Sequence, residues 1–133
     1  MGQPSFDTLQ VYQIADRLAD TVWNIVIGWG WFARDTVGKQ LVKAVDSIGA
    51  NLAEGCGRGT YADNKRFIHI ARGSLNETIC WPNRAATRKL INPEQLRSMS
   101  AMTEELGPRL NAYLNYILKQ LRNNSTGGQP PKE

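Results

Sequence analysis

The chain of 133 residues contains three groups of side chains that could support chemistry. The first is the glycine cluster Gly55, Gly57 and Gly59, a spacing that suggests a phosphate-binding loop. Such a loop follows a β-strand and ends in Gly-Lys-Ser or Gly-Lys-Thr, and this sequence offers neither feature. The cluster therefore favours a turn between two helices.

The second group contains Cys56, His69 and Cys80. Zinc sites use closely spaced pairs such as Cys-x-x-Cys, and no such pair occurs in this sequence. Because His69 is the only histidine, a nucleophile that needs a histidine base has no choice of partners. We expect free cysteines, buried or partly buried, and we expect no metal, no cofactor and no catalytic residue.

The third group is Glu54 and Glu77, which could act as paired carboxylates in acid–base catalysis. We expect them to face each other across two helices, with Arg58 and Arg72 near enough in the sequence to pair with them. The alternative is a structural network of hydrogen bonds between helices, which the pattern favours. We therefore predict that the protein is not an enzyme.

Four segments with apolar residues at helical spacing position these side chains: 8–27, 35–54, 62–89 and 93–122. No segment alternates like a strand, and the connections are short, so we predict an all-α protein, an antiparallel up-down-up-down four-helix bundle. Residues 1–122 form its single domain, and a disordered tail follows at 123–133. The buried face of the third helix is predicted to contain Phe67, Ile70, Ser74, Thr78, Trp81 and Ala85.

Several residues should shape the ends and the course of these helices. Asp7 or Thr8, Asp35 and Asn92 are expected N-caps, because their side chains can accept hydrogen bonds from the free amides of a first turn. Pro82 lacks an amide donor and its ring crowds the preceding turn, so we expect a kink in the third helix.

The net charge of +4 is unevenly distributed along the chain. Segment 58–89 has seven basic and two acidic residues, whereas segments 1–57 and 90–133 carry net charges of −2 and +1. When charge alone is considered, the favoured explanation of this excess is a helix face that is exposed to solvent. A surface that binds phosphates would have the same uneven composition.

Three basic side chains of this segment share one helix face, because Lys65, His69 and Arg72 recur at helical spacing. Arg58 and Arg66 lie near the start of the same helix, where free amides and the helix dipole also favour anions. This face is the best candidate for contact with a nucleic-acid backbone. It lacks an interleaved aromatic platform, so the sequence gives no support for base stacking.

A cluster of aromatic residues occupies the first predicted turn: Trp29, Trp31 and Phe32, with Trp23 nearby. Exposed aromatic residues often mark a subunit interface. The alternative is a local cap over one end of the bundle.

A polar stripe beside the core of the second helix has two explanations as well. It either allows close approach of another helix or simply faces solvent. It consists of Gln40, Ala44, Ser47, Asn51 and Glu54.

The cellular location is predicted from what the sequence lacks. Residues 1–7 do not resemble a targeting segment. The longest apolar stretch, 22–32, is too short to cross a bilayer. Two unpaired cysteines fit a reducing compartment, so we expect a cytoplasmic protein without membrane contact.

Three runs of sequence together resemble the four-helix-bundle family of bacterial 23S rRNA intervening-sequence proteins. The accessory variability proteins of diversity-generating retroelements are similar in fold. The likeness covers about residues 8–120, including an F-x-x-x-A-x-G-S-L-x-E pattern that begins at Phe67. The runs are LQVYQIADRLAD, GKQLVKAVDSIGANLAEGCGR and KRFIHIARGSLNET.

This resemblance implies a ring-shaped homopentamer with a non-enzymatic role involving nucleic acid. In the retroelement branch it implies binding to a reverse transcriptase and to structured RNA. The matched motif positions assigned to a structural polar network are Asp46, Ser47, Asn51, Glu54, Ser74 and Glu77.

Charge and resemblance together predict an accessory protein that binds structured RNA or its DNA copy. The alternative is a protein-interaction scaffold without a nucleic-acid role. The residues predicted to bind nucleic acid are Arg58, Lys65, Arg66, His69, Arg72, Arg84, Arg88 and Lys89.

Overall fold

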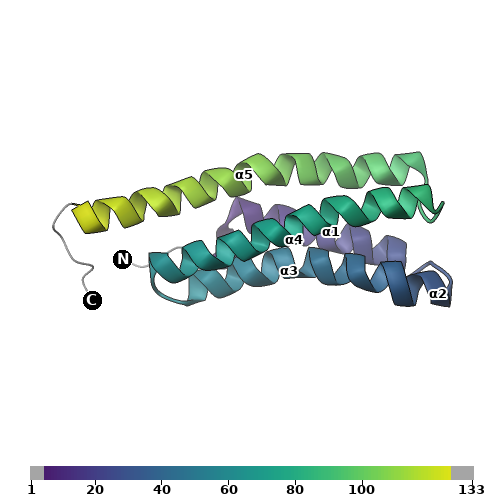
Figure 1. The fold of residues 1–133 in the computed structure, drawn as a ribbon, viewed down its shortest axis with the longest axis horizontal. Coiled ribbons are helices and arrows are strands. Elements are labelled where there is room, and N and C mark those ends of the chain that lie inside the picture. Colours follow the sequence, from purple (N-terminus) through teal and green to yellow (C-terminus); the bar gives the residue numbers. More distant parts are fainter. Residues whose placement is uncertain (1–4, 127–133) are drawn as a thin grey trace.

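The computed structural model describes residues 5–126, and helices are the only regular secondary structure in this range. Four long helices lie side by side in Figure 1: α1 (Gln10–Val26), α3 (Lys39–Gly57), α4 (Tyr61–Thr87) and α5 (Pro93–Thr126). α1 and α4 each contact both α3 and α5, which closes the bundle. The predicted all-α four-helix bundle is confirmed.

The start of α1 differs from the prediction. A short 3-10 helix, η1 (Phe6–Thr8), comes first, and Leu9 is the N-cap residue of α1. The hydroxyl of Thr8 donates to the carbonyl of Ser5 at 2.8 Å, and Asp7 accepts from the Ser5 hydroxyl. These side chains stabilise η1, so the predicted cap at Asp7 or Thr8 is wrong.

The second long helix begins earlier than Asp35. α2 (Trp31–Ala33) continues into a π-helical segment, η2 (Arg34–Gly38), and then into α3. Asp35 lies inside this continuous helical stretch, so its predicted role as N-cap is wrong. Extended backbone at Gly30 begins the stretch instead.

A close contact fixes η2 against α1. Gly38 is buried, and a Cβ atom at this position would lie only 2.6 Å from Cγ1 of Val26. Glycine permits this approach because it has no side chain. The π-helical turn is therefore held tightly against the end of α1.

α4 is a single helix through Pro82 as far as Thr87 (Figure 1). Thr60 is its N-cap, since the Thr60 side-chain oxygen accepts from the amide of Asp63 at 3.1 Å. Ile70 is 43% exposed, so its predicted place on the buried face is wrong. Phe67, Ser74, Thr78 and Ala85 are buried as predicted, and Ile68, Ala71 and Leu75 extend the core face beside them.

α5 begins with the predicted cap. The amide of Gln95 donates to Asn92 Oδ1 at 2.7 Å, and the Asn92 amide donates to Gln95 Oε1 at 2.9 Å. This reciprocal pair resembles a capping box. The helix extends to Thr126, beyond the expected end at 122. The remainder of the predicted tail, 127–133, lies outside the described residues.

The core is continuous along the bundle. Its largest fully buried side chains are aliphatic and come from all four long helices, as in Leu18, Leu41, Ile68 and Leu106. Deleting such a side chain typically costs about 2–5 kcal/mol of stability. Among residues 5–126, no helix is long and apolar enough to cross a membrane.

Candidate nucleic-acid interface

The first group of predicted cations surrounds the N-terminal part of α4. Arg58 and Arg66 both pack on Phe67, with guanidinium carbons 5.1 and 4.6 Å from the ring centroid. Lys65 and His69 are exposed. These contacts hold the two arginines over a buried ring while their charges remain at the surface.

The second group lies at the other end of the same helix. Arg84 and Arg88 are exposed, and Arg84 lies over the ring of Trp81 at 5.5 Å. Lys89 follows with a left-handed backbone, φ 61°. Arg66 and Arg84 are eighteen residues apart on one helix, which corresponds to roughly 27 Å. Most of the predicted basic face therefore forms two clusters, one at each end of α4, and Arg72 lies between them.

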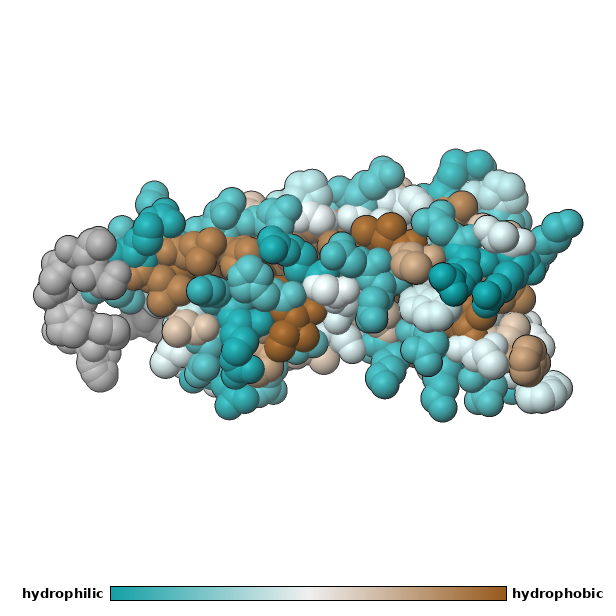
Figure 2. All heavy atoms as spheres, viewed as in Figure 1, coloured by the Kyte–Doolittle hydropathy of each residue, from teal (hydrophilic) through white to brown (hydrophobic). Residues whose placement is uncertain are grey.

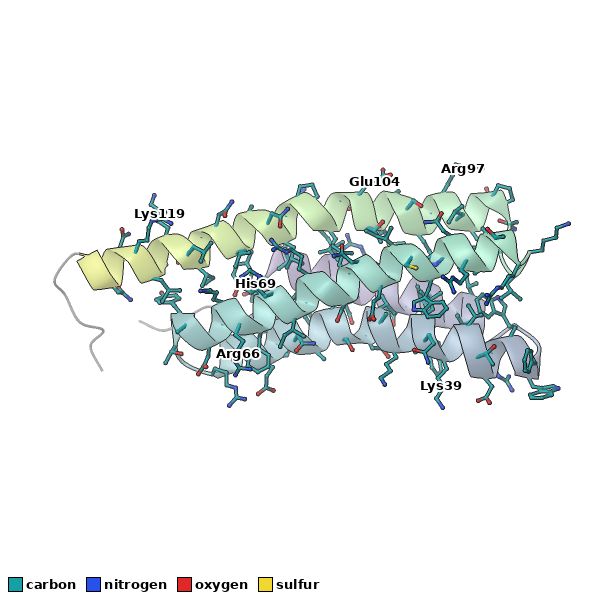
Figure 3. All side chains as sticks on the ribbon, viewed as in Figure 1. Lys39, Arg66, His69, Arg97, Glu104 and Lys119 are labelled. Carbon is teal, nitrogen blue, oxygen red and sulfur yellow. The ribbon has the colours of Figure 1, made fainter. Side chains whose placement is uncertain are left out.

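Figures 2 and 3 show this face of the bundle. Hydrophilic residues cover most of α4 in Figure 2, with apolar residues visible beside the C-terminal part of α5. In Figure 3, Arg66 and Lys39 lie toward opposite ends of the surface formed by α3 and α4, and both point away from the bundle. Lys39 thus adds a charge near the second cluster that the sequence did not assign.

Some of these charges are neutralised and others are not. Arg58 pairs with Glu54 at 3.2 Å, and Arg66 approaches Asp63 at 3.8 Å. Arg72 donates to the neutral amide oxygen of Asn111 on α5 at 3.1 Å, so it keeps its full charge. Within segment 58–89, the cations without a carboxylate partner among the described residues are Lys65, Arg72, Arg84, Arg88 and Lys89.

Glu54 and Glu77 do not meet. Glu54 lies three residues before the end of α3, and Glu77 lies sixteen residues after the start of α4. Because the two helices are antiparallel, this offset separates the carboxylates by roughly 20 Å along the bundle. Glu54 pairs with Arg58, as the sequence suggested, whereas Arg72 bonds to α5 and pairs with neither glutamate.

The predicted polar network between helices is not formed within residues 5–126. Ser47 donates to the carbonyl of Lys43, Asn51 donates to the carbonyl of Ser47, and Ser74 accepts from Thr78 through its carbonyl. Each of these bonds stays inside one helix. Asp46 faces α1, where partial burial and then the charge of Asp20 raise its pKa.

A different polar cluster joins three helices. Asn64 on α4 donates to the hydroxyl of Tyr113 on α5 at 3.0 Å, and Cys56 Sγ on α3 lies 3.4 Å from the same hydroxyl. Burial raises the pKa of Tyr113. No local pattern predicts this cluster, because Tyr113 lies 49 positions from Asn64 and 57 positions from Cys56 along the chain.

The cysteines are free, as predicted, but they differ in exposure. Cys56 is half-buried in that cluster, whereas Cys80 is exposed. The expectation of a buried or partly buried thiol is therefore wrong for Cys80. Its position on the outer side of α4 explains the difference, since the core face lies on the opposite side of the helix.

The aromatic residues of the first turn divide into two sets. Trp29 is half-buried and packs on the core, as a local cap would. Trp31 and Phe32 are 71% and 66% exposed, and Trp23 is 53% exposed. With Ile27, which is 47% exposed, these three form what we call the aromatic end patch.

Comparisons with known proteins agree with this architecture. A crystal structure of a protein of unknown function from the S23 ribosomal protein family of Bacteroides thetaiotaomicron superposes with a TM-score of 0.70. It is 24% identical and covers 78% of this chain and 97% of its own. A search of curated proteins found no match. The profile of the 23S rRNA-intervening sequence protein family matches residues 7–112, and the chain therefore belongs to that family.

Proposed function

We propose that this protein is a non-enzymatic, oligomeric accessory protein that binds the backbone of structured RNA, or of its DNA copy, through the outer surface of α4. A reverse transcriptase is the candidate protein partner, because the chain resembles the accessory proteins of diversity-generating retroelements. The family is named for intervening sequences of 23S rRNA, which makes RNA the natural first ligand to test.

One observation carries this proposal. Five cations of segment 58–89 have no carboxylate partner in the described residues: Lys65, Arg72, Arg84, Arg88 and Lys89. Unpaired surface charges of one sign repel each other, which favours a bound polyanion. Each phosphate that they neutralise releases counterions and adds to the affinity at low salt.

The test is charge reversal at two of the unpaired cations of α4, with Lys65→Glu combined with Arg72→Glu. Binding of a structured RNA to the full chain is measured by fluorescence anisotropy over a salt series. Loss of two phosphate contacts should reduce the slope of log affinity against log salt by roughly two. Affinity at low salt should fall at least tenfold.

The matched control is Arg97→Glu combined with Lys119→Glu, which makes the same change in charge on α5. Both residues are exposed, and Figure 3 places them on the outer side of that helix. RNA affinity should fall much less in this control. Equal losses of RNA affinity in both variants would mean that only the net charge of the protein matters. If the unaltered chain binds no RNA at low salt, the proposal is contradicted.

A second candidate, a protein-interaction scaffold, is favoured by the aromatic end patch. Exposed tryptophans of this kind are typical of protein interfaces. A pull-down with the Lys65→Glu and Arg72→Glu variant separates the two functions. If the variant loses nucleic acid but keeps its protein partners, the nucleic-acid function is supported. If neither nucleic acid nor protein binding changes, the charged face of α4 has no role in binding.

A further inference from the structure

A groove at one end of the bundle combines an indole ring with unpaired cations. It has a volume of about 410 Å³ and lies where η2 and the start of α3 meet the C-terminal part of α4. This volume falls within the range of small-molecule sites. Six of its lining residues bear on its chemistry: Asp35, Lys39, Gln40, Trp81, Arg84 and Arg88.

The aromatic wall of the groove is fixed in place. Trp81 is half-buried and packs against the core. The guanidinium carbon of Arg84 lies 5.5 Å from its ring centroid. Nucleic-acid bases stack on aromatic side chains and on arginine planes. This wall therefore presents two planar groups for stacking, the Arg84 guanidinium and the indole beneath it, which the sequence did not reveal.

The charges of the groove favour an anion. Three cations, Lys39, Arg84 and Arg88, line the groove together with a single carboxylate residue, Asp35. None of these four side chains forms an ion pair within residues 5–126. A ligand that carries both a planar ring and a phosphate would match the wall and the charges at once.

The opposite wall is a π-helix, an uncommon structure that is frequent at functional sites. η2 supplies Asp35, Thr36 and Val37 to the groove. Gly38 at its end lies against Val26 with no room for a side chain. This packing holds the wider turn against α1.

We propose that this groove binds one unpaired nucleotide of a nucleic-acid strand, with the base against Trp81 and Arg84 and the phosphate beside Lys39 and Arg88. The inference rests on the proposed function and specifies its ligand. Base-paired nucleotides are already stacked and do not enter such a groove. Single strands, loops and bulges are therefore preferred to duplex at this end of α4, and stacking gives little sequence preference.

The test compares a single-stranded RNA decamer with a duplex of the same number of phosphates, both measured by anisotropy on the full chain. The variant is Trp81→Leu, which keeps an apolar side chain against the core. One lost base–aromatic stack should lower single-strand affinity by about 5- to 150-fold. Duplex affinity should change less than twofold. The matched control is Trp23→Leu, an exposed tryptophan of the aromatic end patch outside the groove, which should leave the ratio of single-strand to duplex affinity unchanged.

Two further measurements do not depend on the folding of the Trp81 variant. A 2-aminopurine base in the decamer should lose fluorescence on binding to the unaltered chain, because stacking on indole quenches it. Arg84→Gln, at an exposed position, should weaken the single strand more than the duplex.

The outcomes distinguish this inference from the proposed function. If the unaltered chain binds neither RNA at low salt, the proposed function fails. If it binds both and the folded Trp81→Leu variant binds the decamer equally well, only the groove assignment fails. A peptide rich in aspartate and glutamate that loses binding in Trp81→Leu, with RNA binding unchanged, would assign the groove to a protein partner and overturn the inference.

Discussion

At the scale of single residues, Gly55 sets how closely α3 and α4 can pack. It is buried, and a Cβ atom there would overlap Oδ1 of Asn64 and lie 3.1 Å from Cβ of Phe67 and 3.3 Å from the backbone of Asn64. Neither the Phe67 Cβ nor the Asn64 backbone can move without shifting α4. The glycine that suggested a phosphate loop in the sequence is a packing residue.

Gly55→Ala should therefore destabilise the fold by about 1–3 kcal/mol, the usual cost of overpacking. The measurement is urea unfolding followed by circular dichroism. Gly73→Ala is the matched control, since nothing lies within 4 Å of the added methyl on α4. That change should stabilise the helix by about 0.5–1 kcal/mol. Equal effects of the two substitutions would contradict the packing role of Gly55.

Tyr113 predicts how stability depends on alkaline pH. Burial and then the hydrogen bond with Cys56 raise its pKa above the ordinary value of 10.0, whereas tyrosine in the unfolded chain keeps that value. Above pH 10 the unfolded chain therefore loses the proton first and is favoured. Stability should be full below about pH 10 and fall as pH rises beyond it.

Urea unfolding at pH 8 and pH 11 measures this loss. In Tyr113→Phe the fall between the two pH values should be smaller, because the titrating group is gone. At pH 8 the same variant should lose about 1–3 kcal/mol, since the hydrogen bond from the Asn64 amide to the Tyr113 hydroxyl is lost. An unchanged difference between pH 8 and pH 11 would exclude Tyr113 as the source.

At the scale of elements, the end of α4 combines a helix stop with a basic cluster. The amide of Lys89 bonds to the carbonyl of Ala86, and that of Leu90 to the carbonyl of Ala85, so Lys89 occupies the left-handed position where glycine is preferred. The left-handed conformation costs an ordinary residue about 1–2 kcal/mol. A lysine at this position supplies charge at the expense of stability.

Lys89→Gly should separate these two effects. The melting temperature should rise, corresponding to a gain of about 1 kcal/mol, because glycine adopts this conformation without strain. Affinity for RNA should fall at the same time, since one phosphate contact is lost. Lys119→Gly, at an exposed position in the interior of α5, should instead lower stability. A stabilised Lys89→Gly variant with unchanged RNA affinity would remove Lys89 from the interface.

The sequence predicted the long helices well, because each depends on local periodicity. Asn92 and its partner Gln95 were also readable, since a capping box is a local pattern. The helical start at Trp31 could not be predicted from a local pattern, because η2 is stabilised by the approach of Gly38 to α1. The predicted burial of Ile70 was wrong for a related reason. Apolar residues occur on more than one side of α4, and packing against the neighbouring helices decides which of them are buried.

At the scale of the whole molecule, the aromatic end patch points to self-association. Trp23, Ile27, Trp31 and Phe32 are all between 47% and 71% exposed at one end of the bundle. Burial of such side chains favours assembly by roughly 1.5–3 kcal/mol each. The homopentamer that the sequence resemblance implies stays a prediction.

Light scattering at micromolar concentration should give the mass of a pentamer for the unaltered chain. Trp31→Ser combined with Phe32→Ser should shift it toward the monomer while leaving the helical content unchanged, because neither residue is buried in the core. Ile70→Ser, at an exposed apolar position on α4, is the control and should leave the mass unchanged. A monomeric unaltered chain would end the assembly hypothesis.

By itself, the sequence determined the four long helices and the concentration of positive charge in segment 58–89, since both follow from local order along the chain. Tertiary packing alone decided which charges stay unpaired and brought Lys39 and Gln40 from α3 opposite Trp81 on α4. It also joined Cys56, Asn64 and Tyr113. The physical reason is that periodicity fixes the faces of a helix, whereas the register between helices depends on the side chains that must fit together in the core.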